Sequence, residues 1–88
     1  MFLHVVGVEY IEGYRLRLQF NDGAIKEIDL KDELYGEVFE PLKDVDFFRK
    51  AAVNPDTNTI EWPNGADFAP EFLYELGKSI KPGTKAAA

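Results

Sequence analysis

The residues best suited to binding chemistry lie in one short segment that contains Trp62, Asn64, Gly65, Asp67 and Tyr74. Tryptophan and tyrosine side chains concentrate binding energy at protein interfaces. A lone carboxylate such as Asp67 can anchor a polar group. We therefore take these five residues as candidate interface or motif residues. Four of them would surround a small groove for the backbone or a side chain of a partner: Trp62, Asn64, Asp67 and Tyr74.

The same residues also have a structural explanation. Asp67 precedes the last expected helix, where a carboxylate can accept amide protons of the first turn and interact favourably with the helix dipole. Asn64 and Gly65 follow Pro63 in an expected turn, where such residues supply an Asx hydrogen bond or a positive φ. The sequence favours this cap-and-turn interpretation and leaves the binding groove as its alternative.

The remaining residues match no familiar catalytic or metal-binding pattern. The 88 residues include no cysteine and a single histidine, His4, which excludes a thiolate zinc site and an imidazole cage. Acidic pairs such as Asp29 with Asp32 fit solvated faces better than a hydrolase dyad, because a chain this short has little room for a cleft. No nucleophile elbow, phosphate loop or EF-hand spacing occurs. We therefore expect no catalytic residue, no metal and no cofactor.

The charge of the chain disfavours nucleic acid and membrane partners. Sixteen acidic and 10 basic residues give a net charge of -6, so the average surface repels phosphate backbones and anionic lipids. The basic residues are dispersed, and no apolar run approaches the ~20 residues of a membrane span. The N-terminal segment also lacks the pattern of a signal peptide. We expect a cytoplasmic protein with a protein partner.

The chain is expected to form one α+β domain over residues 1–78 and a flexible tail over 79–88. A chain of this length, with 45% hydrophobic residues, encloses a single core. Alternating residues predict strands over 5–11, 14–20 and 24–30, which form an antiparallel three-stranded meander.

The second half of the domain is expected to contain two helices and another hairpin. An irregular crossover over 31–41 leads to a short helix over 42–50, followed by a second β-hairpin over 51–62. The C-terminal helix begins between Phe68 and Pro70 and runs to Gly77. Its expected inward residues are Phe72, Leu73 and Leu76.

Only one register of the first hairpin keeps like faces together. A three-residue loop over 21–23 places Leu16 opposite Ile28 on the inner face, and a slip of one residue would reverse every side chain. The same register pairs Phe20 with Ala24, Tyr14 with Leu30, Arg17 with Glu27 and Arg15 with Asp29. We therefore predict that the last two pairs form cross-strand ion pairs, which explain the arginines without a ligand.

Four motifs occur in a defined order: Leu16-x-Leu18-x-Phe20-x-Asp22-Gly23, then Asp29-Leu30, Asp46-Phe47-Phe48 and Trp62-Pro63-Asn64-Gly65-Ala66-Asp67-x-x-Pro70-Glu71-x-Leu73-Tyr74. Over residues 5–76 this order resembles the small bacterial proteins of domain-of-unknown-function family 2442. The resemblance implies an α+β fold without established enzymatic activity, often within two-gene modules of the toxin and antitoxin type. Some members carry a DNA-binding helix-turn-helix after this domain. No such extension follows here, so a protein partner is the better expectation.

Three hypotheses about function remain open. The first is a non-catalytic protein interaction module, an antitoxin-like subunit whose acidic surface binds a small basic companion protein. The second is a small-molecule-binding or weakly catalytic domain with Asp67 as its polar anchor. The third is an accessory transcriptional regulator that binds DNA. The identity of the partner and the oligomeric state do not follow from the sequence.

Overall fold

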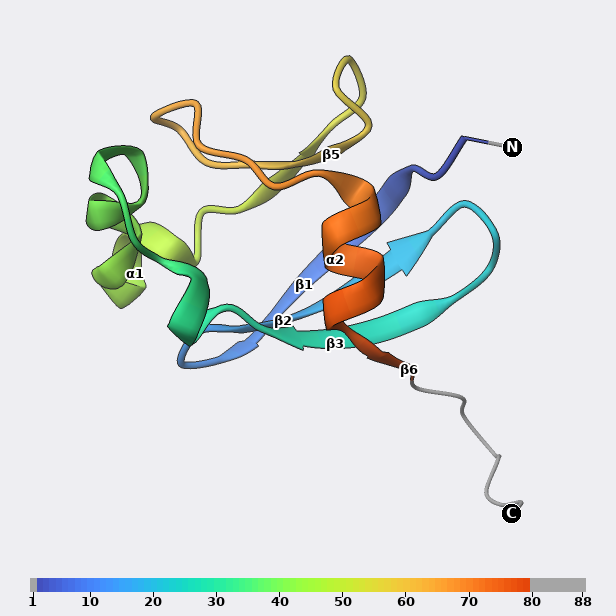
Figure 1. Ribbon diagram of the computed structural model, residues 1–88, viewed down its shortest axis with the longest axis horizontal. Helices are drawn as coiled ribbons and strands as arrows, with labels where there is room; N and C mark the ends of the chain where they lie inside the picture. The colour runs from blue at the N-terminus through green and yellow to red at the C-terminus, as the bar shows by residue number, and fades with distance from the viewer. Residues whose placement is uncertain (1, 80–88) are drawn as a thin grey trace.

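The computed structural model describes residues 2–79 and shows a four-stranded antiparallel sheet, a separate β-hairpin and short helices (Figure 1). The strand order is β1-β2-β3-β6. The sheet contains β1 (Val5–Glu12), β2 (Arg15–Phe20), β3 (Ile25–Asp29) and β6 (Lys78–Ser79). The hairpin consists of β4 (Ala52–Asn54) and β5 (Thr59–Glu61) and contacts β1. The predicted α+β fold, with its three-stranded meander and second hairpin, is confirmed.

The first hairpin has the register that the sequence predicts. Leu16 pairs with Ile28 and Arg17 with Glu27, while the Phe20 amide donates to the Ala24 carbonyl at 2.9 Å across the three-residue loop. One predicted ion pair is wrong. Arg15 lies opposite Asp29 but bonds instead to Glu12 and, diagonally, to Glu27, whereas the Asp29 carboxylate accepts the Lys31 backbone amide.

The core fills the space between the inner face of the sheet and the elements that cover it. Alternation along β2 and β3 sends every second side chain inward, as the strand period of two requires. Trp62 and Phe48 are the largest buried side chains, and the Trp62 Nε1–H donates to the Phe48 carbonyl at 2.8 Å. The buried hydrophobic residues are Val5, Leu16, Leu18, Phe20, Ile28, Leu30, Leu34, Leu42, Phe48, Ile60, Trp62, Ala66 and Leu73.

The crossover from β3 to β4 is more ordered, and its α-helix shorter, than predicted. Two 3-10 helices, η1 (Lys31–Glu33) and η2 (Glu37–Lys43), precede α1 (Val45–Phe48). Asp44 separates η2 from α1 because its backbone is extended and its side chain caps α1 by accepting the Asp46 amide at 3.0 Å. The short helix predicted over 42–50 is therefore present as α1 but spans only Val45–Phe48. The buried residues Leu42 and Phe48 come from two different helices.

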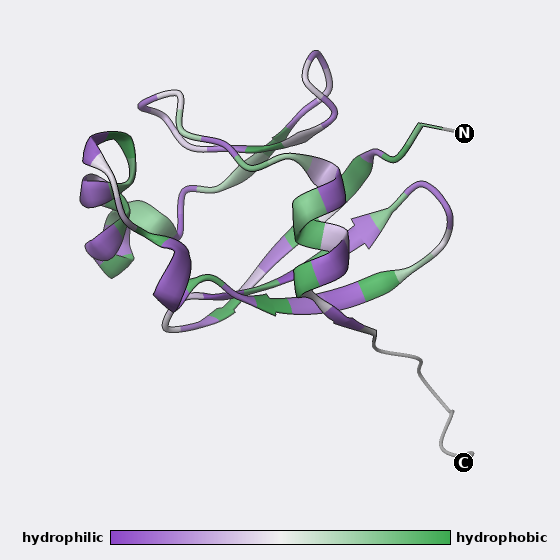
Figure 2. Cartoon of the chain, viewed as in Figure 1, coloured by the Kyte–Doolittle hydropathy of each residue, from purple (hydrophilic) through white to green (hydrophobic). Residues whose placement is uncertain are grey.

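Helix α2 (Pro70–Leu76) begins and ends close to the predicted bounds, but its exposed face differs from the prediction. Leu73 is fully buried, as expected. The inward positions predicted for Phe72 and Leu76 are wrong, since these side chains are 39% and 36% exposed. Hydrophobic and hydrophilic stretches alternate along the helix (Figure 2).

The chain continues from α2 into β6, an edge strand that the sequence did not predict. Lys78 pairs with Glu27 of β3, so β6 lies beside β3 in the sheet. Gly77 makes this close approach possible, because a Cβ at this position would lie 2.8 Å from Ile28 Cγ1. The predicted tail over 79–88 lies outside the described residues from residue 80 onward. Between residues 2 and 79, no helix is long and apolar enough to cross a membrane.

Candidate functional site

A row of stacked aromatic rings joins η2 to α2 at the surface. The ring centroids of Phe39 and Phe68 lie 4.7 Å apart at an interplanar angle of 22°, and those of Phe68 and Phe72 lie 5.5 Å apart at 16°. Leu76 extends the row, because residues four apart on a helix are neighbours on its surface. We use the term aromatic row for Phe39, Phe68, Phe72 and Leu76.

The aromatic row remains partly open to solvent. Phe72 and Leu76 are exposed, while Phe39 and Phe68 are half-buried. The adjoining Val38 is 46% exposed. Single exposed apolar residues are common, but neighbouring ones gathered on one surface mark sites of protein interaction. The aromatic row is therefore the candidate functional site.

Trp62 supports the aromatic row from below. Its ring lies edge-to-face against Phe68, with the centroids 6.0 Å apart and an interplanar angle of 80°. The tryptophan is only 1% exposed. Trp62 therefore supports the candidate site from the core and does not itself present a contact surface.

The turn after Trp62 ties η2, which carries Phe39, to the segment that leads into Phe68. Asn64 Oδ1 accepts the Ala66 amide at 3.1 Å, and Gly65 has a φ of 88°, which confirms the predicted Asx hydrogen bond and positive φ. The Asn64 Nδ2 also donates to the Val38 carbonyl at 2.9 Å. This side-chain bond fixes η2 beside the segment before α2, so that Phe39 reaches Phe68.

Three exposed carboxylates border the aromatic row. Asp67 directly precedes Phe68, and Glu71 and Glu75 lie four residues apart on α2 beside Phe72 and Leu76. We call Asp67, Glu71 and Glu75 the acidic border. None of the three forms an ion pair with a base of residues 2–79. The border is therefore a patch of negative charge that the described part of the chain does not neutralise.

The predicted capping role of Asp67 is wrong. The N-cap position of α2 is Ala69, and no side chain caps the helix. Pro70 occupies the first helical position and lacks an amide proton, so one of the amides that a helix start leaves without a partner inside the helix is absent. Asp67 instead lies in an extended segment that forms an antiparallel bridge with Glu61.

Tyr74 lies with a different set of residues from the other candidates. Its hydroxyl donates to Asp22 Oδ2 at 2.7 Å, and its ring meets Phe20 edge-on with the centroids 4.9 Å apart. The buried Lys26 Nζ lies 3.7 Å from the Tyr74 ring centroid and donates to the Tyr74 carbonyl at 2.5 Å. The hydrogen bond from Tyr74 holds the pKa of Asp22 below its ordinary value, and the same bond raises the pKa of Tyr74. These contacts anchor the C-terminal part of α2 to the first hairpin.

The structure thus places Trp62, Asn64, Gly65 and Asp67 in one loop at the aromatic row and separates Tyr74 from them. The sequence analysis missed Phe39, Phe72 and Leu76 as surface residues. Phe72 and Leu76 are four residues apart and share one face of α2, and Phe68 precedes them at the same spacing, but spacing alone does not show whether that face is covered.

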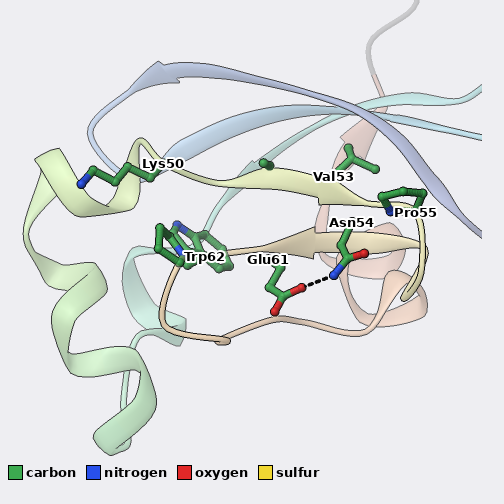
Figure 3. A pocket seen from close by; sticks show the side chains of 8 residues that line it. Lys50, Val53, Asn54, Pro55, Glu61 and Trp62 are labelled. Atoms are coloured by element: carbon green, nitrogen blue, oxygen red, sulfur yellow. Dashed lines mark hydrogen bonds between the residues drawn. The ribbon is translucent and has the colours of Figure 1, made fainter.

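A shallow groove of 340 Å³ runs along the second hairpin (Figure 3). Within it, Asn54 Nδ2 donates to the Glu61 carboxylate, and Asn54 Oδ1 accepts the Asp56 amide at 2.9 Å. These polar groups are therefore engaged with one another, and Asp67 does not line the groove. Within residues 2–79, no three His, Asp or Glu side chains lie close enough together to hold a metal ion.

The comparisons with known proteins give one match. A family model described as Protein of unknown function (DUF2442) matches residues 5–79. This range includes the sheet, the second hairpin, the aromatic row and the acidic border. No curated protein and no solved structure gives a significant match.

Proposed function

This chain belongs to the DUF2442 family of proteins of unknown function, and we propose that it acts as a non-catalytic protein interaction module in the cytoplasm. The observation that carries the proposal is the exposed aromatic row beside an acidic border without basic partners in residues 2–79. The partner is a small companion protein with apolar anchors and a basic surface. In this proposal the chain is the antitoxin-like subunit of a two-gene module, for which the support is the resemblance to its family.

The composition of the aromatic row suits binding. Fully burying a phenylalanine or leucine side chain stabilises a complex by about 1.5–3 kcal/mol, and aromatic residues are enriched in interface cores. Trp62 holds Phe68 from the buried side, so the row loses little side-chain freedom when a partner covers it. A preformed surface of this kind reduces the entropic cost of association.

The alternative centred on Asp67 has less support. A catalytic or ligand-anchoring carboxylate works best in a concave site that excludes water. Asp67 is exposed and lies outside the groove of Figure 3. Its position in the acidic border suits electrostatic attraction of a protein partner better.

The proposal can be tested by affinity capture from the native lysate with the tagged wild type, Phe72→Ser and Phe2→Ser. Phe2 is 84% exposed and lies outside the aromatic row, so the two variants make the same chemical change at two exposed phenylalanines. We expect one partner to be recovered by the wild type and by Phe2→Ser but lost by Phe72→Ser. Circular dichroism checks that both variants remain folded.

Two results would contradict the proposal. Equal recovery by folded Phe72→Ser and the wild type would show that the aromatic row is not the interface. Failure of the wild type to recover any specific partner, while the companion protein is present in the lysate, would remove the interaction module itself.

A further inference from the structure

We infer that the segment bound by the aromatic row is a basic amphipathic α-helix of another protein, which packs along α2. This inference rests on the proposed function and specifies the chemistry of the partner. It follows from the spacing of the row, from the backbone that carries it and from the charge beside it.

The spacing of the aromatic row matches the repeat of a helix. Its ring centroids are 4.7 and 5.5 Å apart, and Leu76 lies about one helical turn beyond Phe72. A partner helix presents an apolar residue about every 5.4 Å along one face. An extended strand presents residues of one face roughly 6.6–6.8 Å apart, which falls out of step with the rings.

The backbone beneath the aromatic row offers no edge to an extended peptide. A peptide that adds as a strand needs unpaired amides and carbonyls along a sheet edge. The α2 amides of Leu73 and Gly77 already donate to Ala69 and Leu73 at 3.1 and 3.0 Å. Recognition at this surface therefore depends on side chains, which suits a partner helix whose own backbone bonds are internal.

The charge beside the aromatic row selects a basic partner and disfavours a second copy of this chain. Asp67 adjoins Phe68 in the sequence, Glu71 and Glu75 adjoin Phe72 and Leu76 on α2, and the whole chain carries a net charge of -6. Two copies meeting through this surface would bring like charges together, which weakens association. Lysine or arginine residues flanking the apolar stripe of a partner helix would neutralise the acidic border.

A photo-crosslinking amino acid of the benzophenone type, placed at residue 72 or 76 of the full chain in its native cells, tests this inference. Replacing Leu76 as well as Phe72 guards against loss of binding through one altered side chain. Replacing Phe2 provides the control at an exposed phenylalanine outside the row. Mass spectrometry of the cross-linked peptides then identifies the contacted residues of the partner.

We expect both row positions, and not position 2, to cross-link to another protein. The contacted residues should lie three or four apart in one segment with a net positive charge. Cross-links to an acidic segment, to positions that alternate as in a strand, or to a second copy of this chain would overturn the helical basic partner while leaving an interaction module in place. No cross-link at either row position, and no partner captured by the wild type, would overturn both proposals.

Discussion

The outer face of the four-stranded sheet and the aromatic row are both open to solvent, but their exposed groups are satisfied differently. On the sheet, Glu27 accepts bonds from Arg15 at 2.9 Å and from Arg17 at 3.0 Å, and these arginines also pair with Glu12 and Glu9. At the aromatic row, stacked rings lie beside carboxylates that have no basic partner within residues 2–79.

This difference shows why exposure alone does not indicate function. Each charged group of the sheet network has its counter-ion in the same chain. The aromatic row combines apolar area with negative charge, and neither is compensated in the described part of the chain. A second protein can cover the apolar area and neutralise the negative charge at the same time.

Trp62→Ala should have the largest effect, because it removes the support beneath the aromatic row. We expect it to lower the free energy of unfolding by about 3–5 kcal/mol, since it leaves a cavity and removes the Nε1–H bond to the Phe48 carbonyl, which then keeps only the Ala51 amide at 3.3 Å. Urea denaturation measures the change. Phe72→Ala, at the surface, should cost about 1 kcal/mol or less. If both variants cost the same, Phe72 belongs to the core and the row is not a separate surface.

Phe72→Ala should next weaken binding of the captured partner. An aromatic anchor at the centre of an interface contributes about 2 kcal/mol or more, which corresponds to a roughly 30-fold rise in Kd. Ile25→Ala, on the outer face of the sheet, should leave Kd nearly unchanged. Isothermal titration calorimetry compares the two variants, and a larger effect at Ile25 would move the interface to the sheet.

Glu71→Gln combined with Glu75→Gln should slow association of that partner several-fold at low salt, because border charges act mainly on the rate of encounter. The dissociation rate should change less. The matched control is Glu9→Gln with Glu12→Gln, which alters two exposed glutamates whose charges the sheet arginines already neutralise. Stopped-flow fluorescence at several salt concentrations measures both rates. If the control variant slows association equally, the effect comes from the net charge of the whole chain and not from the acidic border.

The smallest expected effect is the pH dependence contributed by the sheet network. The hydrogen bond from Arg17, with that from Arg15, lowers the pKa of Glu27. The unfolded state therefore binds a proton more readily, so this contribution to stability is present above the ordinary glutamate pKa and is lost as the pH falls through the lower folded value.

Glu27→Gln should accordingly flatten the acid side of the stability profile, followed by thermal unfolding between about pH 3 and pH 6. Glu75→Gln in the acidic border makes the same chemical change at a carboxylate without an ion pair to a base of residues 2–79 and serves as the control. If the stability of Glu27→Gln depends on pH as the wild type does, the arginines of the sheet network do not stabilise the Glu27 carboxylate, and the contrast with the acidic border fails.

Local rules predicted the meander and the turns. The three-residue loop and the period of two along β2 and β3 determine which residues pair, because a hairpin brings together residues close in sequence. The Asn64–Gly65 turn was predictable for the same reason, since its hydrogen bond spans two residues. The family motif between Trp62 and Tyr74 was also visible, because it occupies one continuous segment.

Local rules failed where the answer depended on side-chain directions, on the exact start of a helix or on a distant segment. The pairing of Arg15 with Glu27 in place of Asp29 required the actual side-chain directions across β2 and β3. The capping role of Asp67 was lost because α2 begins at Pro70. The strand β6 exists because Gly77 lets the chain return against β3, some fifty residues away in sequence.

The sequence by itself determined the elements whose interactions are local: the strands of the meander and of the second hairpin, the first-hairpin register and the turn that carries Asn64. Only the tertiary structure decided which side of α2 is buried. Leu73 faces the core while Lys26 and Asp22 hold Tyr74 from the first hairpin, and this orientation leaves Phe72 and Leu76 partly exposed to solvent. Helical spacing is the same for a buried and an exposed apolar face, so the rotation of α2 depends on contacts with strands far away in the chain.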